Sequence, residues 1–448
     1  MSGGRWVRVV SVAAIAGVFA GVLAGCRGGG PRAVPASDDR WLVVWAGDAD
    51  RRHSDFLAII DPGGKVVRTI PVKSAGNEPQ DVNSDPRRDQ RVFATGALTN
   101  RTFVFDLHDP RQGVLARIDD PGTSRPLAGP RGVASIPGGR TVIACADATG
   151  YRGGPSEVVR SSGGLRVLGD DGRFERDVPA SGEAAKGFIV APAGVALQPS
   201  LRRLVTTSEG HGFTPTAQGE LIPGITIQLW SMPGLTFEKH VVLEAGPRGE
   251  ENLGPRTPVF LRRKPVLLVN TRQGGALYVS DTMDLPDPVF RLAYDFGAGS
   301  LPGGAAVTPD DRFYVTTLAG THRVVVLSLD KPLAPREVSS VRLDHVSSGG
   351  EGEVRRGGPS ALAMSQDGTR IAVADYTADV PGYRADGDRR VYVLRLEPGT
   401  GRLRLDNSFR DEESGEVGVD FDRGVWPHGK TGPARPHGLL FVSGGQGG

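Results

Sequence analysis

Short apolar runs of about five to seven residues recur along the chain, and residues that favour turns separate them. The first three runs occupy 41–47, 56–61 and 66–72, and later ones include 140–145 and 370–374. Runs of this length, bounded by Gly, Pro, Asn and Asp, predict β-strands rather than helices. We therefore expect an all-β protein with many short strands.

A phrase that begins with proline recurs at intervals of roughly 50–60 residues. Most copies carry a small residue two places after the proline, then an apolar stretch and a turn. The seven copies begin at Pro79, Pro130, Pro192, Pro255, Pro302, Pro359 and Pro436, and the copy at Pro255 is the weakest. Three further strands follow most copies, so each repeat predicts a four-stranded unit. Such a period and strand number are typical of β-propeller blades.

The two ends of the repeat region complement each other. The last copy, 436–443, has no strands after it, and the first strands, from Trp41 onwards, have no proline-initiated strand before them. We therefore predict that residues 41–448 form a seven-bladed β-propeller, closed by the C-terminal strand pairing into the first blade. Two separate β domains would instead leave open sheet edges.

The N-terminus has the pattern of a bacterial lipoprotein signal. Arg5 and Arg8 precede an uncharged stretch, 9–25, which ends in Leu-Ala-Gly before Cys26. This pattern predicts a signal peptide over 1–25 and a lipid on Cys26, with 26–40 as a flexible tether. The protein would then be anchored to a membrane of the bacterial cell envelope, outside the cytoplasm. The alternative is an uncleaved membrane anchor.

Composition narrows the possible functions. The chain has 448 residues, of which 38% are hydrophobic, so wholesale disorder is excluded. Its two cysteines exclude a disulfide scaffold and a four-cysteine zinc site, and Cys145 is expected to be a buried strand thiol. Basic and acidic residues number 53 and 51, without a lysine-rich block, so a nucleic-acid partner is not expected.

The long irregular segments all join second to third strands, or one blade to the next. In a propeller these two kinds of connection lie on the same face. Long loops that an architecture does not need are often functional, so we expect this face to bind a ligand or a protein, although the segments could also be inserts without a role. They are Asp147–Gly163, Ser208–Gly224, Ser347–Gly357, Tyr376–Gly387 and Asp411–Arg435.

The residue after each proline is expected to ring the entrance of the central channel on that face. These residues are Gln80, Arg131, Ala193, Arg256, Gly303, Ser360 and His437, with Asp81 next to the first. Guanidinium groups suit carboxylate, phosphate or sulfonate groups, so the ring predicts a small anionic ligand. Alternatively, the arginines pair with neighbouring acids and tie blades together.

No local motif for metal binding or catalysis is present. The eight histidines form no H-x-H or H-E-x-x-H group. A metal at His437, His211 and Asp420 would require the fold to bring them together. There is also no nucleophile elbow, P-loop or paired CxxC motif. We therefore predict no cofactor from the residues alone.

Several stretches in the C-terminal third resemble the selenium-binding protein family, in the family's order and at similar spacing. The resemblance extends more weakly over residues 75–445, and it implies a seven-bladed β-propeller. The matching stretches are Thr308–Phe313, Arg356–Pro359 with Ser365–Gly368, Gly401–Leu405, Val419–Phe421, and Gly432–Ala434 with His437.

The family's bacterial members include copper-dependent methanethiol oxidases, whose metal site uses histidines. His437 matches one of these, but 130–134 lacks the two histidines of the family's Pro-His-Thr-x-His, and 78–80 lacks a further pair. Arg262 replaces another histidine, and we add it to the candidate ligand-binding residues. The resemblance thus implies a binding module that has lost the copper site. The alternative is a copper-dependent thiol oxidase with a rebuilt site.

Overall fold

The computed structural model separates the chain into two units, Met1–Pro35 and Ala36–Gly448. The described residues all belong to the second unit. They are 41–84, 91–122, 124–148, 162–181, 190–211, 222–343, 346–348, 354–356, 358–376 and 387–443. The predicted signal peptide, the tether and Cys26 therefore lie outside the described residues.

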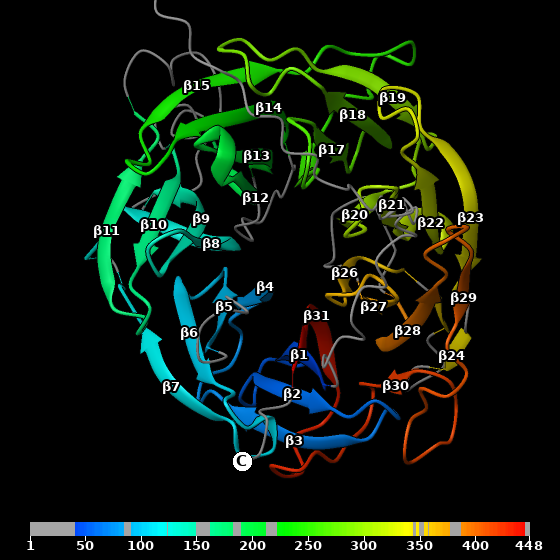
Figure 1. The fold of residues 1–448 in the computed structure, drawn as a ribbon. Coiled ribbons are helices and arrows are strands. Elements are labelled where there is room, and N and C mark those ends of the chain that lie inside the picture. Colours follow the sequence, from blue (N-terminus) through cyan, green and yellow to red (C-terminus); the bar gives the residue numbers. More distant parts are fainter. Residues whose placement is uncertain are drawn as a thin grey trace, which may run out of the picture. The chain divides into compact units, whose positions relative to one another are not determined.

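Seven antiparallel sheets are arranged in a ring, as Figure 1 shows. We number these blades in chain order. From the inside outwards, blade 1 consists of β31 (Ala434–Val442), β1 (Trp41–Asp48), β2 (Phe56–Ile60) and β3 (Val66–Pro71). Blade 2 consists of β4 (Pro79–Ser84), β5 (Arg91–Gly96), β6 (Arg101–Asp106) and β7 (Val114–Asp119). Blade 3 consists of β8 (Leu127–Ile136), β9 (Arg140–Ala148), β10 (Gly164–Leu168) and β11 (Phe174–Pro179).

Blades 4 to 7 follow the same order. Blade 4 consists of β12 (Pro192–Gln198), β13 (Arg203–His211), β14 (Ile222–Ser231) and β15 (Phe237–Val242), and blade 5 of β16 (Pro255–Phe260), β17 (Leu267–Thr271), β18 (Ala276–Ser280) and β19 (Arg291–Asp295). Blade 6 consists of β20 (Pro302–Val307), β21 (Phe313–Leu318), β22 (Arg323–Ser328) and β23 (Arg336–Arg342). Blade 7 consists of β26 (Ala361–Met364), β27 (Arg370–Ala374), β28 (Arg390–Leu396) and β29 (Leu403–Leu405).

The C-terminal strand closes the ring, as the sequence predicts. β31 pairs antiparallel with β1 from Trp41 opposite Val442 to Asp48 opposite Ala434. Its far side meets β4 and β26, the innermost strands of the two neighbouring blades. The first and last strands of the described unit therefore belong to one blade.

The hydrophobic core lies between neighbouring blades rather than at the centre of the ring. Trp45 of blade 1, for example, contacts Phe103 and Phe105 of blade 2, with ring centroids 5.2 and 6.0 Å apart. Its indole N–H donates to the carbonyl of Thr95 at 2.8 Å. Each blade thus buries its two faces against its neighbours, which a single blade could not do.

The proline phrase marks a β-bulge at the start of an innermost strand. In six blades the ladder between the first two strands shifts register directly after the proline; for example, Pro192 pairs with Ser208 and pairing resumes at Val195 opposite Thr206. Bulges re-aim side chains next to functional sites. In these blades the bulge therefore turns the residue after the proline towards the channel.

The small residue of the phrase permits close approach between innermost strands. A Cβ on Gly132 would lie 2.3 Å from the carbonyl oxygen of Ala193, and one on Gly194 would lie 2.0 Å from that of Arg256. Both distances are shorter than a Cβ can tolerate, so glycine is required there. The first residues of the seven innermost strands can therefore converge on one opening.

We call the rim where the innermost strands begin the entry rim. Because strands alternate in direction, second-to-third and blade-to-blade connections return to this rim, as predicted. Most of 147–163, 208–224 and 376–387 lies outside the described residues. Two of the expected loops contain strands: β24 (Val346–Ser348) pairs with β25 (Val354–Arg356), and β30 (Val419–Asp420) pairs with β28.

The described residues also form short 3-10 helices at Pro110–Gln112, Pro199–Leu201 and Ala319–Thr321. Among the described residues, no helix has the length and apolar character needed to cross a bilayer. Cys145 is fully buried in β9, as predicted, and burial raises the pKa of its thiol to about 12.

Candidate functional site

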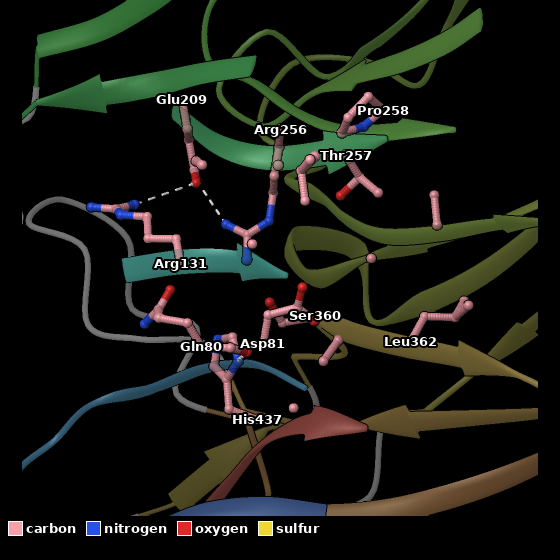
Figure 2. Close-up of a pocket in the computed structure, with 18 of the residues that line it drawn as sticks. Gln80, Asp81, Arg131, Glu209, Arg256, Thr257, Pro258, Ser360, Leu362 and His437 are labelled. Carbon is pink, nitrogen blue, oxygen red and sulfur yellow. Dashed lines mark hydrogen bonds and ion pairs between the residues drawn. The ribbon is translucent and has the colours of Figure 1, made fainter. Parts of the chain in front are cut away.

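A pocket of 220 Å³ opens where the seven innermost strands begin (Figure 2). Every blade contributes to its lining. The polar side chains in the lining are Gln80, Asp81, Arg131, Glu209, Arg256, Thr257, Ser360 and His437.

Six of the seven predicted ligand-binding residues line this pocket: Gln80, Asp81, Arg131, Arg256, Ser360 and His437. Their ability to bind a ligand remains a prediction. Arg262, the seventh, does not line the pocket. Arg262 is exposed and lies beyond the end of β16, whereas Arg256 lies near the start of this strand. The backbone N–H of Arg262 donates to Asp311 at 2.8 Å.

Glu209, near the end of β13, is the acid around which the arginines gather. Its carboxylate accepts a hydrogen bond from Nη1 of Arg256 at 2.7 Å. Arg272 Nε lies 3.6 Å and Arg131 Nη1 lies 3.9 Å from the same carboxylate. Blades 3, 4 and 5 are thus tied together at their inner ends, as the ion-pair alternative predicts.

The charge of Glu209 is maintained by these three neighbours. Burial alone would raise the pKa of the Glu209 carboxyl, but the guanidinium groups of Arg256, Arg272 and Arg131 outweigh it and hold the pKa below its usual range. Glu209 is therefore ionised at neutral pH.

Arg256 retains hydrogen-bonding capacity that this cluster does not use. Its Nη1 binds Glu209, and its backbone carbonyl accepts from Thr207 Oγ1 at 2.6 Å. Its Nε and Nη2 make no hydrogen bond to any residue in the described part of the chain. The side chain is 20% exposed, so these donors remain accessible from the pocket.

Threonines on second strands fix the pocket residues in place. The hydroxyl of Thr207 donates to the Arg256 carbonyl, that of Thr95 to the Arg131 carbonyl, and that of Thr317 to the Ser360 carbonyl, over 2.6 to 2.9 Å. Each bond crosses from one blade to the next. The residue after the proline is thus held by the preceding blade, so the pocket is pre-organised.

Asp81 brings a second carboxylate to the lining. Its two oxygens accept backbone N–H groups of Val82 and Val133, each at 2.9 Å. Burial raises the pKa of Asp81 to about 6, against the opposing effects of these amides and of Arg256. Burial also raises the pKa of Asp147, which lies near Arg131. The pocket therefore becomes more positive as the pH falls through about 6.

His437 is a neutral imidazole with a fixed tautomer. Its Nδ1 lies 2.5 Å from the carbonyl oxygen of Gln80. Because a carbonyl only accepts, Nδ1 carries the proton and Nε2 carries the lone pair. Burial, reinforced by Arg256, lowers the pKa of His437 to about 4. His437 is therefore uncharged at neutral pH.

The side chains around the pocket do not fit copper. His437 uses one nitrogen for the Gln80 carbonyl, and the guanidinium groups nearby repel a cation. In the described part of the chain, the three side chains close enough to share a metal are Asp48, Asp50 and His53, away from this pocket. A lone imidazole does not hold copper.

The structure does not place Asp420 with His437. Asp420 lies on β30 beside β28, the third strand of blade 7, with its carboxylate 3.3 Å from Arg390. The side chain of His211 is outside the described residues. The predicted metal alternative therefore lacks one of its three ligands.

Comparison with known proteins shows similarity in structure only. No protein-family model and no curated protein sequence matches the chain. A hypothetical selenium-binding protein from Sulfolobus tokodaii superposes with a TM-score of 0.68 at 16% identity, over 90% of this chain and 94% of that one.

Two further similar structures are of proteins named as lactonases. The periplasmic gluconolactonase of Pseudomonas aeruginosa gives a TM-score of 0.60 at 14% identity, covering 90% of this chain and 99% of that chain. A putative 6-phosphogluconolactonase from Bacteroides fragilis gives 0.55 at 13%, covering 91% and 100%. At these identities the comparisons establish the fold: this chain is a seven-bladed β-propeller similar to those of a selenium-binding protein and of gluconolactonases.

Proposed function

We propose that this protein is a lipid-anchored, extracytoplasmic binding module that holds a small carboxylate at the entry rim of its propeller. The observation that carries this proposal is the unused hydrogen-bonding capacity of the Arg256 side chain. This side chain reaches the pocket and is held by Glu209, while Thr207 holds the backbone carbonyl of the same residue. The Nε and Nη2 of Arg256 have no partner among the described residues. Two parallel donors on a fixed guanidinium match the two oxygens of a carboxylate.

A carboxylate suits the pocket better than a phosphate dianion does. Asp81 and Glu209 already place two carboxylates in the lining. They offset two of the three guanidinium charges of Arg131, Arg256 and Arg272, so a singly charged ligand completes the charge balance. A single charge is balanced by Arg256 with the help of Arg131. The bound group would therefore be a monocarboxylate.

The comparisons support this proposal at the level of fold. Selenium-binding proteins and gluconolactonases share the architecture, and we propose a distant relationship to the former, from the sequence resemblance. The hydrolysis of a lactone gives a hydroxy acid, so carboxylates are products in the second group. The copper-dependent oxidase alternative finds no support in the side chains around His437.

Carboxylate binding is expected to depend on Arg256 and on pH. Isothermal titration of the protein with gluconate should show 1:1 binding, weakened at least tenfold by Arg256→Gln, because the fork that pairs with the carboxylate is lost. Arg256→Lys keeps the charge but not the fork, and should weaken binding by a similar factor. Binding to the wild type should be tighter at pH 5 than at pH 7.5, because protonation of Asp81 removes a negative charge from the pocket.

The matched control is Arg262→Gln, which removes an arginine beyond the opposite end of the same strand. It should bind gluconate as the wild type does. Equal loss of affinity in both variants, or unchanged affinity in Arg256→Gln, would show that the arginine fork is not the binding element.

Lipid attachment is expected at Cys26, because its position after Leu-Ala-Gly fits a lipoprotein processing site. Mass spectrometry of the protein extracted from membranes should show an N-terminus at Cys26, with a diacylglyceryl group on the thiol. Cys26→Ala should lack this modification. An intact N-terminus from Met1 on unmodified wild-type protein would contradict the proposal and favour an uncleaved anchor.

A further inference from the structure

Three neutral side chains line the pocket on the side away from the arginine cluster. They are Gln80 of blade 2, Ser360 of blade 7 and His437 of blade 1, which we call the neutral wall. Figure 2 shows them on the far side of the pocket from Glu209, with the Asp81 carboxylate among them. Each of them points a polar group into a cavity that Arg256 enters from the other side.

Ser360 has an unused hydroxyl in an almost fully buried position. The residue is 1% exposed, and its backbone N–H and carbonyl are occupied by Ala374 and Thr317. Its Oγ makes no hydrogen bond to any described residue, although it lines the pocket. Because Ser360 lines the pocket, its hydroxyl can bond to water or to a ligand held there.

The other two members of the wall are also available. His437 is 7% exposed, and its Nε2 has a lone pair without a partner in the described residues, since Nδ1 is used on the Gln80 carbonyl. The side-chain amide of Gln80 likewise makes no hydrogen bond within the described part of the chain. The wall thus offers an acceptor at His437 and groups at Gln80 and Ser360 that both donate and accept.

This set of groups selects for hydroxyl groups. A ligand carbonyl or ether oxygen only accepts and cannot bond to Nε2 of His437. An alkyl chain would displace water from all three groups and bond to none of them. A hydroxyl both donates and accepts, so it satisfies any member of the wall. A site built on such groups discriminates strongly against analogues that lack the hydroxyl.

We infer that the ligand is a small hydroxycarboxylate of the sugar-acid class, with its carboxylate on Arg256 and its hydroxyl groups on Ser360, His437 and Gln80. This inference rests on the proposed function, because it uses the carboxylate site at Arg256. The inference adds the chemical class of the rest of the ligand. It also adds the orientation of the ligand, which extends across the pocket from blade 5 towards blades 7, 1 and 2.

The test compares two acids of equal charge and equal carbon number, gluconate and hexanoate. Titration calorimetry on the full-length protein should show gluconate binding at least tenfold more tightly than hexanoate. Ser360→Ala should weaken gluconate binding about tenfold and leave hexanoate binding unchanged. Ser200→Ala, at an exposed serine in the 3-10 helix Pro199–Leu201, is the matched control and should change neither.

The outcomes separate this inference from the proposed function. If both acids bind equally, or if Ser360→Ala affects both alike, the hydroxyl-selective wall is refuted while the carboxylate site stands. If neither acid binds to the wild type, the proposed function fails and the inference fails with it. Thermal unfolding of each variant should remain cooperative, which distinguishes lost contacts from lost structure.

Discussion

Removal of β31 by a stop codon after Pro433 is expected to leave the protein unable to fold. The strand forms the inner edge of blade 1 and carries Leu439, Phe441 and Val442, which are at most 7% exposed. Burial of such side chains stabilises by roughly 1.5–3 kcal/mol each, so these three alone account for about 5–9 kcal/mol. This is comparable with the total stability of a typical domain, about 5–15 kcal/mol. Circular dichroism should show no cooperative thermal transition.

A stop codon after Ser443 is the matched control, because it leaves β31 complete at Val442. This shorter protein should unfold within a few degrees of the wild type. A protein truncated after Pro433 that unfolds cooperatively at the wild-type temperature would contradict closure of the ring by the C-terminal strand.

Glu209→Gln is expected to destabilise the protein by about 3–5 kcal/mol, the range for breaking a buried ion pair by removal of one partner. The glutamine keeps the shape of the side chain but leaves Arg131, Arg256 and Arg272 close together without their shared counter-charge. Urea unfolding should show a lower midpoint with an unchanged slope. Gluconate should restore part of the loss, because its carboxylate replaces the missing charge.

Glu238→Gln provides the comparison. Glu238 is an exposed glutamate on β15 that lies 3.9 Å from Arg203, and removal of its charge should change stability by no more than about 0.5 kcal/mol. Equal stability of the two variants would show that the arginines do not depend on Glu209.

The repeat predicts the fold well because it encodes local geometry. The proline after each blade-to-blade connection starts an innermost strand, and the bulge that follows turns the next residue inward. Arg131, Arg256, Ser360 and His437 are therefore identified from the sequence, although they come from four blades. Strand boundaries follow for the same reason: β27 is Arg370–Ala374 both in the expectation and in the structure.

The partners of these residues are harder to predict. Glu209 lies at the end of a second strand and meets Arg256 across 47 positions of sequence, a contact that depends on how two blades come together. The available signal is an acidic residue at the end of the strand Arg203–His211, on the entry rim. Arg262 shows the converse: its correspondence with a family histidine suggests a site residue, but six residues beyond Arg256 the strand has crossed to the opposite rim.

The segment 411–435 shows why length alone does not identify a functional loop. Phe421 and Trp426 are buried, with ring centroids 5.1 Å apart, and Trp426 packs on Phe56 of β2 at 4.7 Å. Arg423 forms a buried ion pair with Asp411. This segment therefore helps to seal blade 7 against blade 1, and its contribution is to the closure of the ring.

A ring of seven blades gives the site its rigidity. Each pocket side chain sits on a strand whose backbone is held by the neighbouring blade, as the bond from Thr207 to the Arg256 carbonyl illustrates. Little conformational entropy is then lost when a ligand binds. A small pocket with one open guanidinium fork therefore suits the small acid that we propose as its ligand.

A crystal structure of the protein with gluconate tests the central claim most directly. We predict both carboxylate oxygens within about 3 Å of Arg256 Nε and Nη2, with hydroxyl groups on Ser360 and His437. Gluconate bound away from the entry rim, or an empty pocket at saturating gluconate with Arg256 engaged by Glu209 alone, would contradict it.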